Sequence, residues 1–366
     1  MLEVYGAGEC FGRRASAFVT RTAPLGATVR YRLGVDERDR YGRALAYVWL
    51  ADGRFLNRLL VARGYAEPLT VPPNIEYEDV SCARRRARGR LAAGCGAGSD
   101  AAGRLAAVLR HVTSSDGVRI ACEVSGQGPP VVLVHGAGSA RWSFDAMRPL
   151  LESSFTVIAI DRRGHGDSTD AGEYELRREY EDVAAVVQDA GEGAVLMGHS
   201  YGGLVAAGAA GLLDELRRLA LYEPPMGGVL ADPATIDRWE RLIEEGDRDP
   251  VVREFLGQIG GYDQPAIDEM ARTQLWDARK QVTPTLPREL RAELAHRLDC
   301  DALAAVTAPA LLLVGTESPG WATHSTEAYA DVLPNAEKRL LEGQGHGANV
   351  SAPELLAGEL TRFLSK

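Results

Sequence analysis

Residues 194–210 read AVLMGHSYGGLVAAGAA, which is an apolar run, a serine flanked by glycines, and a run of small helix-forming residues. Ser200 occupies the centre of the pattern G-x-S-x-G, between Gly198 and Gly202. Between a strand and a helix, this pattern is typical of a nucleophile elbow, because the glycines permit a sharp turn and the serine stays exposed in a strained conformation. The N-terminus of the following helix would also favour a developing negative charge. The stretch therefore predicts a nucleophilic Ser200, with an ordinary turn serine as the alternative.

Short apolar runs and helical patterns alternate on both sides of this stretch. Strand-like runs lie at residues 117–124, 129–139, 155–168, 216–225 and 308–319. Amphipathic patterns predict helices at 141–154 and 176–191. Apolar strands that alternate with helices indicate an α/β fold with a mostly parallel sheet covered on both faces. From Pro225 to about Asp301 the sequence becomes charged and helical, which predicts a helical cap at about residues 226–300.

Reactive groups in an open α/β sheet collect at the carboxyl ends of the strands. His346 lies in the glycine-rich stretch LEGQGHGANV, between a strand and the final helix, and is the predicted catalytic histidine. His135, in VLVHGAG, is predicted to have a structural role in the loop that surrounds the oxyanion. The backbone N–H groups of Ala137 and Tyr201 are the predicted oxyanion donors.

Four motifs in this order, HGAGS, DRRGHGDS, GHSYGG and GQGH, occur in residues 111–366. Through them this part of the chain resembles the α/β-hydrolase superfamily. The resemblance implies a Ser–His–acid triad, an acyl-enzyme, an ester-like small-molecule substrate, and no cofactor or metal. A serine nucleophile argues against the haloalkane dehalogenases and epoxide hydrolases of the superfamily, which use an aspartate. A carboxylesterase (EC 3.1.1) is expected first, while a lactonase and a carbon–carbon bond hydrolase would use the same residues.

The triad acid is where this sequence departs from the family pattern. Most relatives place an aspartate after the strand that corresponds to APALLLVG, but here that position holds Ser318. Glu317 is adjacent, although a shift of one residue redirects its side chain. Glu223, in LALYEPP, ends the preceding strand, a position that some family members use. We favour Glu223 as the acid and keep Glu317 as the alternative. Glu223 could instead have only a structural role, in which its carboxylate fixes the entry to the cap.

The cap is expected to shape the substrate pocket. Its apolar and aromatic side chains, spaced as in helices, are either pocket residues or ordinary packing residues. The candidates are Trp239, Phe255, Leu256, Ile259, Met270, Leu275 and Trp276.

The first 80 residues have a different character, with strand-like alternation from Thr28 to Tyr65. ECFGRRASAFVTR (9–21) and DRYGRALAYVWLADGRFLNRLLVARGYAE (39–67) resemble the latter part of a staphylococcal-nuclease-like domain. The resemblance implies a partial OB-like barrel at 1–80, in which Arg43 contacts phosphate. The metal-binding aspartates and the catalytic glutamate of that family precede the matched part, so we expect a truncated segment that is inactive as a nuclease.

Residues 81–110 consist almost entirely of Arg, Ala and Gly and are predicted to be a linker, although a shifted reading frame in GC-rich DNA would also produce such a stretch. Residues 1–110 carry 18 Lys and Arg against 11 Asp and Glu, and the remainder carries 23 against 40. The basic front end predicts at most weak contact with nucleic acid. This contrast in charge indicates two modules.

The composition narrows the class of protein. No apolar run approaches the roughly 20 residues that span a bilayer, which predicts no membrane partner. Five scattered cysteines, without a C-x-x-C pair, argue against a disulfide framework and a zinc site, and we expect a cytoplasmic protein. The alternative to an enzyme is a binding or scaffold protein with a degenerate triad. The sequence predicts no oligomeric state.

Overall fold

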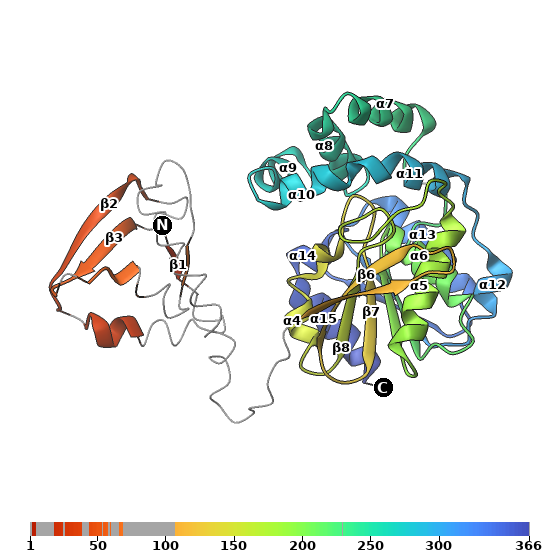
Figure 1. Cartoon of the computed structure of the whole chain (residues 1–366), viewed down its shortest axis with the longest axis horizontal. Helices are drawn as coiled ribbons and strands as arrows, with labels where there is room; N and C mark the ends of the chain where they lie inside the picture. The colour runs from red at the N-terminus through yellow and green to blue at the C-terminus, as the bar shows by residue number, and fades with distance from the viewer. Residues whose placement is uncertain are drawn as a thin grey trace. The chain divides into compact units, whose positions relative to one another are not determined.

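A computed structural model describes residues 2–4, 18–24, 26–38, 44–52, 54–57, 59, 66–68, 107–228 and 230–365. The chain divides into two compact units, Met1–Ala106 and Ala107–Lys366 (Figure 1). The second unit begins four residues before the predicted start at 111, because the chain already enters an edge strand at Val108.

An eight-stranded sheet organises the second unit, in the order β12-β11-β10-β9-β7-β8-β6-β5. The strands are β5 (Val108–Thr113), β6 (Arg119–Gly126), β7 (Pro130–Val134), β8 (Thr156–Ile160), β9 (Val195–His199), β10 (Arg218–Tyr222), β11 (Ala310–Gly315) and β12 (Ala336–Leu341). The strands from β8 to β12 in the sheet order are parallel, while β6 pairs antiparallel with both β8 and β5. The predicted α/β fold with a mostly parallel sheet is confirmed.

Helices connect these strands and cover the sheet on both faces (Figure 1). Those outside the cap are η2 (Arg141–Phe144), α4 (Arg148–Leu151), α5 (Leu176–Ala190), α6 (Tyr201–Ala210), α12 (Cys300–Ala304), α13 (Gly320–Val332), α14 (Ala348–Ser351) and α15 (Pro353–Leu364). The segment 141–154, predicted as one helix, is instead the turn η2 followed by the short helix α4. Pro149 lies in the first turn of α4, where its missing N–H costs nothing, whereas inside a continuous helix it would break the ladder.

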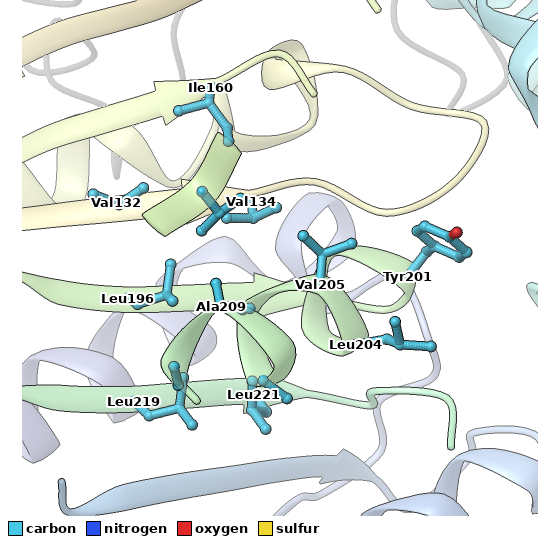
Figure 2. Packing of buried hydrophobic residues seen from close by; sticks show 14 of the residues in the cluster. Val132, Val134, Ile160, Leu196, Tyr201, Leu204, Val205, Ala209, Leu219 and Leu221 are labelled. Carbon is cyan, nitrogen blue, oxygen red and sulfur yellow. The ribbon is translucent and has the colours of Figure 1, made fainter. Parts of the chain in front are cut away.

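The apolar strands read as continuous runs because both faces of the sheet are buried. On one face Val132, Leu196 and Leu219 pack against α5 and α6 (Figure 2). On the other face, alternate residues such as Leu133 and Met197 pack in a second cluster with side chains of α4 and α15. Burial on two sides explains why the strand sequences lack polar alternation.

Between β10 and β11 the chain forms a helical cap at one end of the sheet (Figure 1). Its elements are α7 (Pro233–Glu244), α8 (Arg248–Gln258), α9 (Gln264–Met270), α10 (Leu275–Val282), η3 (Thr283–Thr285) and α11 (Leu286–Ala295). Asp232 and Asp263 cap two of these helices, with side chains that accept hydrogen bonds from the N–H groups of Thr235 and Ala266. Each cap is followed by a proline in the first helical turn, which fixes where the helix begins.

The first unit contains two small antiparallel sheets in its described residues. Strand β1 (Leu2–Val4) pairs with β4 (Ala66–Pro68), and β2 (Val29–Arg38) pairs with β3 (Ala44–Leu50). A small apolar cluster forms around Phe18, Leu50 and Leu56. These strands agree with the predicted small β-rich segment, whereas Arg43 lies outside the described residues.

Among the residues that the structure describes, no helix combines the length and apolar character needed to cross a membrane.

Truncation of a buried side chain in strand β9 should lower the stability of the fold, because it leaves a cavity. Leu196 in β9 is fully buried, so we expect Leu196→Ala to lower the free energy of unfolding by about 2–5 kcal/mol. Leu340, in strand β12, is 55% exposed, and Leu340→Ala should change it by less than about 0.5 kcal/mol. Urea unfolding followed by circular dichroism measures both. Equal losses in the two variants would contradict this assignment of the core.

Candidate active site

Ser200 occupies a strained turn between β9 and α6. Its φ of 54° and ψ of −129° are unusual for a residue with a side chain. Glycine is required on both sides: a Cβ on Gly198 would lie 2.2 Å from the carbonyl oxygen of Gly202, and a Cβ on Gly202 would lie 2.3 Å from that of His135. The chain therefore folds as the sharp strand-to-helix elbow that the sequence predicts, with Ser200 at its apex.

A chain of hydrogen bonds connects three of the predicted site residues. Ser200 Oγ lies 2.9 Å from His346 Nε2, and His346 Nδ1 lies 2.5 Å from Glu223 Oε2. In this arrangement Nδ1–H donates to the carboxylate and Nε2 accepts from the hydroxyl. All three side chains are buried. The structure thus brings Ser200, His346 and Glu223 together in the geometry of a Ser–His–acid triad.

Glu223 is fixed on both its backbone and its carboxylate. Its φ of 49° turns the chain at the end of β10. Oε1, the oxygen turned away from the histidine, accepts hydrogen bonds from Gly315 N at 2.8 Å and from Ser318 Oγ at 2.5 Å. Ser318 stands at the position where the family pattern expects an aspartate, and here its hydroxyl supports the glutamate instead.

Glu317 does not join this arrangement. Its side chain is exposed, and its backbone N–H donates to Gln344 O at 2.9 Å. Of the two predicted acids, the structure places Glu223 on the histidine and leaves Glu317 in the solvent-facing part of the loop.

Two aromatic side chains that the sequence analysis missed position the histidine loop. The Nε2–H of His199 donates to the carbonyl oxygen of His346 at 2.8 Å, and its ring stacks on Tyr222 with centroids 4.9 Å apart. The Tyr222 hydroxyl donates to Gly345 O and accepts from Ala348 N. Burial, together with the neighbouring His346, lowers the pKa of His199 to about 3, so this ring is neutral near pH 7. His199 occupies a position of G-x-S-x-G where any residue is allowed, so the sequence gave no signal that it positions the histidine loop.

The predicted oxyanion donors lie beside the nucleophile. Ala137 lines the same cavity as Ser200, and Tyr201 is the first residue of α6. Gly136 packs so closely that a Cβ there would lie 3.0 Å from Ser200 Cβ. No hydrogen bond from either Ala137 N or Tyr201 N is present among the described residues. Neither N–H group is therefore engaged by another backbone acceptor in that part of the chain.

His135 holds this loop by its side chain. Its Nδ1–H donates to Gly136 O at 2.8 Å, and its Nε2 accepts from Arg162 N at 3.1 Å. Burial and the nearby Arg162 guanidinium lower the pKa of His135 well below its usual value, which keeps the ring neutral and suits this tautomer. The contacts agree with a structural role.

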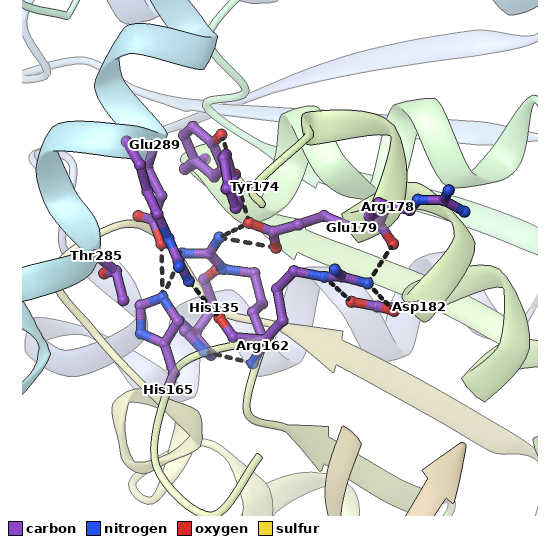
Figure 3. A network of polar contacts seen from close by, with 12 residues as sticks. His135, Arg162, His165, Tyr174, Arg178, Glu179, Asp182, Thr285 and Glu289 are labelled. Atoms are coloured by element: carbon purple, nitrogen blue, oxygen red, sulfur yellow. Dashed lines mark hydrogen bonds and ion pairs between the residues drawn. The ribbon is translucent and has the colours of Figure 1, made fainter. Parts of the chain in front are cut away.

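A buried ionic network ties the cap to the sheet (Figure 3). The Arg162 guanidinium, just after β8, contacts Glu179 of α5 at 2.7 Å and Glu289 of the cap helix α11 at 3.1 Å. Glu289 also accepts from His165 Nε2 at 2.6 Å. Burial alone would raise the pKa of Glu289, but Arg162 and His165 hold it below its usual value. Because the network is desolvated, loss of one partner would leave an uncompensated buried charge.

A cavity opens between the elbow and the cap, with a volume of about 60 Å³. Its described lining residues are Gly136, Ala137, Ser139, Ser143, His199, Ser200, Phe255, Leu256, Ile259, Gly260, Tyr262, Arg279, His346, Gly347, Asn349 and Val350. This volume is well below the roughly 300–1,000 Å³ of pockets for drug-sized ligands, so the space suits a small substrate.

Only some of the predicted pocket side chains reach this cavity. Phe255, Leu256 and Ile259 line it. Trp239 is fully buried in the core, Trp276 and Met270 pack within the cap, and Leu275 is exposed. Within the described part of the chain, no group of three or more His, Cys, Asp or Glu side chains is arranged to hold a metal ion.

Comparison with protein families identifies both parts of the chain. Residues 131–359 match the family described as "Alpha/beta hydrolase family". Residues 3–91 match the family described as "Staphylococcal nuclease homologue". Both predicted resemblances are confirmed.

Individual relatives match about two thirds of the chain. A 2-(acetamidomethylene)succinate hydrolase of Mesorhizobium japonicum is 26% identical over 250 residues, which cover 65% of this chain and 89% of the relative. A pimeloyl-[acyl-carrier protein] methyl ester esterase of Aeromonas hydrophila is 26% identical over 264 residues, covering 67% and 99%. The crystal structure of an α/β hydrolase from Sphaerobacter thermophilus superposes with a TM-score of 0.62 at 36% identity, covering 69% of this chain and 99% of that one. The chain belongs to the α/β-hydrolase family, with a staphylococcal-nuclease-like segment before the hydrolase domain.

Proposed function

We propose that the protein is a serine hydrolase that cleaves a small carboxylic ester (EC 3.1.1) through an acyl-enzyme on Ser200. The observation that carries this proposal is the hydrogen-bonded chain from Ser200 through His346 to Glu223, which faces a small cavity. A serine hydroxyl is a weak nucleophile until a neighbouring base takes its proton, and His346 Nε2 lies at the distance that this transfer requires.

In the acylation step Ser200 Oγ attacks the ester carbonyl while its proton passes to His346 Nε2. The carbonyl oxygen becomes an oxyanion that accepts hydrogen bonds from the N–H groups of Ala137 and Tyr201. Glu223 holds the imidazole in the tautomer that accepts at Nε2 and stabilises the imidazolium that forms. His346 then gives its proton to the leaving alcohol, and the C–O bond breaks to leave the acyl group on Ser200.

Deacylation repeats the chemistry with water as the nucleophile. His346 removes a proton from the water, the hydroxide attacks the acyl carbonyl, and the same two N–H groups bind the second oxyanion. Collapse of this intermediate returns the proton to Ser200 Oγ and releases a carboxylic acid. The free enzyme is regenerated without a cofactor.

The named activities of relatives support a hydrolytic acyl transfer. One relative is named as a methyl ester esterase and another as the hydrolase of a succinate derivative. An ester is the substrate class we propose first, because its alcohol leaving group needs no assistance beyond the proton that His346 carries.

For the nuclease-like segment we propose, at most, weak binding to nucleic acid and no cleavage. Arg43 supplies one phosphate-binding cation, while hydrolysis of a phosphodiester by the family's chemistry also needs a metal held by carboxylates.

Removal of the nucleophile or of its acid should abolish most of the esterase activity. For hydrolysis of p-nitrophenyl acetate by the full chain, we expect Ser200→Ala to lower kcat by roughly 10⁴–10⁶-fold and Glu223→Gln by roughly 10⁴-fold, because an amide no longer orients or stabilises the histidine. Glu317→Gln, with the same change of charge in an exposed side chain, is the matched control and should stay within about twofold of the wild type.

Steady-state assays at pH 8 on variants with the far-UV spectrum of the wild type measure these effects. A larger loss in Glu317→Gln than in Glu223→Gln would return the acid to the later loop. Hydrolysis that survives Ser200→Ala undiminished would refute the proposed mechanism.

The hydrogen bond from Ser318 to the carboxylate of Glu223 should contribute to the rate of ester hydrolysis. Ser318→Ala removes one of the two hydrogen bonds to Glu223 Oε1 and leaves the one from Gly315 N. Because a hydrogen bond to a charged group contributes about 1.5–3 kcal/mol, kcat/KM on p-nitrophenyl acetate should fall at least tenfold. An unchanged kcat/KM in a folded Ser318→Ala variant would show that the hydroxyl contributes nothing to the acid.

The nuclease-like segment should not cleave DNA. We expect the full chain carrying Ser200→Ala to leave single-stranded and double-stranded DNA intact in 10 mM Ca²⁺, as followed by gel electrophoresis over hours. Cleavage that depends on Ca²⁺ and is lost in Arg43→Ala would contradict the proposal.

A further inference from the structure

One arginine of the cap faces the active-site cavity. Arg279, on helix α10, lines the same cavity as Ser200 and His346. Its guanidinium lies over the ring of Trp142, 5.1 Å from the ring centroid, which fixes the flat side of the group. The edge of a guanidinium carries its N–H donors, so hydrogen bonding remains open in the plane of the group.

Arg279 has no counter-ion within the described residues. The structure gives it neither a hydrogen bond nor an ion pair to any of them, in contrast to other arginines of the cap that hold carboxylates. Those pairs are Arg238–Glu254, Arg253–Asp249, Arg288–Asp170 and Arg291–Glu240. Arg279 is half-buried, and a partly desolvated guanidinium that lacks an anion carries a cost that a bound anion would offset.

The charge of Arg279 is unopposed inside the cavity itself. None of the described residues that line it is an aspartate or a glutamate, and Arg279 is the one arginine or lysine among them. Burial lowers the pKa of Arg279, and no neighbouring carboxylate raises it, although an arginine side chain stays protonated in proteins. His199 is neutral near pH 7 and adds no charge. Arg279 is therefore the cationic group that the cavity lining offers to an anion, while the nearby Glu223 carboxylate is engaged by His346, Gly315 and Ser318.

A second unpaired group lies in the same cavity. The hydroxyl of Ser143 is buried, only 5% of the residue is exposed, and Oγ has no hydrogen-bond partner among the described residues. Ser143 follows Trp142, on which Arg279 stacks, and both residues belong to the turn η2. Other buried serine hydroxyls, those of Ser114, Ser125 and Ser325, also lack a partner among the described residues, but of these serines Ser143 is the one that lines the cavity, as does Asn349, whose Oδ1 is likewise unpaired. A ligand in the cavity could supply the missing partner of the Ser143 hydroxyl.

We propose that Arg279 and Ser143 bind a carboxylate of the substrate, so that the enzyme hydrolyses a small anionic ester in preference to a neutral ester of the same shape. This inference rests on the proposed ester hydrolysis by Ser200. The guanidinium would donate to the carboxylate in its own plane and the hydroxyl would add a third donor. The cavity is small, which limits the substrate to a short chain between the carboxylate and the ester.

Two matched pairs of esters test the proposal with the full chain. Monomethyl succinate carries the carboxylate on its acyl part, and methyl levulinate replaces it by a neutral acetyl group of similar size. Acetoxyacetate carries the carboxylate on its leaving group, and acetoxyacetone is its neutral counterpart. Product formation is followed by proton NMR at constant ionic strength. The variants are Arg279→Gln, Arg279→Lys, Ser143→Ala and, as a control, Lys280→Gln.

Lys280 is the matched control because it is the next residue on α10 and pairs with Asp277 at 2.7 Å instead of lining the cavity. We expect the wild type to prefer the anionic member of at least one pair. Arg279→Gln should lower kcat/KM for that ester by roughly 10- to 150-fold, mainly through KM, and leave its neutral partner within about threefold. Arg279→Lys should recover part of the loss, Ser143→Ala should lose at least fivefold, and Lys280→Gln should resemble the wild type.

A further measurement is independent of which ester is used. Succinate should inhibit hydrolysis of p-nitrophenyl acetate competitively in the wild type and in Lys280→Gln, and much less in Arg279→Gln. The role of Arg279 would be overturned if Arg279→Gln lost activity equally on both members of each pair. It would also be overturned if the wild type showed no preference for an anionic ester and no inhibition by succinate. In either case, Ser200-dependent hydrolysis of the neutral esters would still support the proposed function. Absence of Ser200-dependent hydrolysis of every ester, p-nitrophenyl acetate included, would overturn both.

Discussion

The hydrogen bond from His346 Nδ1 to Glu223 Oε2 depends on how two neighbouring strands end. Strands β9 and β10 are parallel and in register, with His199 opposite Tyr222, so the next residues, Ser200 and Glu223, leave the sheet side by side. The Ser200 N–H donates to Tyr222 O at 2.9 Å, which holds the two turns together. Both residues adopt a positive φ that side chains rarely take. Backbone strain of this kind persists only where surrounding contacts enforce it. Here the apolar cores on the two faces of the sheet provide those contacts. The position of the nucleophile relative to its acid is therefore a property of the sheet.

The cap supplies part of the lining of the cavity beside this centre. Its helix α11 is tied to the sheet by the buried Arg162–Glu289 contact, and its helices α8 and α10 contribute Phe255 and Arg279 to the cavity. The same segment thus provides an apolar wall and an unpaired cation to the cavity that Ser200 lines. A rigid connection between cap and sheet matters because small displacements of positioning groups reduce the rate of acyl transfer strongly. We propose that charge and small size select the substrate.

Local sequence was sufficient for the parts of the site that depend on one turn. Ser200 and His346 each lie in a glycine-rich stretch that follows a strand, which predicts reactive groups at the carboxyl ends of the strands, and the parallel sheet follows from apolar runs of strand length. Glu223 was favoured because Ser318 occupies the usual acid position. The contact of Glu223 with His346, however, depends on the tertiary structure and cannot be deduced from local sequence. Residues that act through partners on distant elements, such as Tyr222 on the histidine loop and Arg279 in the cavity, carry no signal in their own neighbourhood. The helix expected at 141–154 is interrupted for a local reason: Pro149 is tolerated in the first turn of a helix but not in its interior, and a new helix, α4, begins there.

Covalent labelling with a fluorophosphonate, read by intact mass and peptide mapping, shows whether Ser200 is an activated nucleophile. The phosphorus centre is attacked by an activated serine and mimics the tetrahedral oxyanion, so labelling needs the nucleophile, the base and the oxyanion donors together. We expect a single adduct on the peptide that contains Ser200, formed at a rate that Glu223→Gln reduces by orders of magnitude. No adduct, an adduct on another residue, or a rate unaffected by Glu223→Gln would contradict the proposed mechanism.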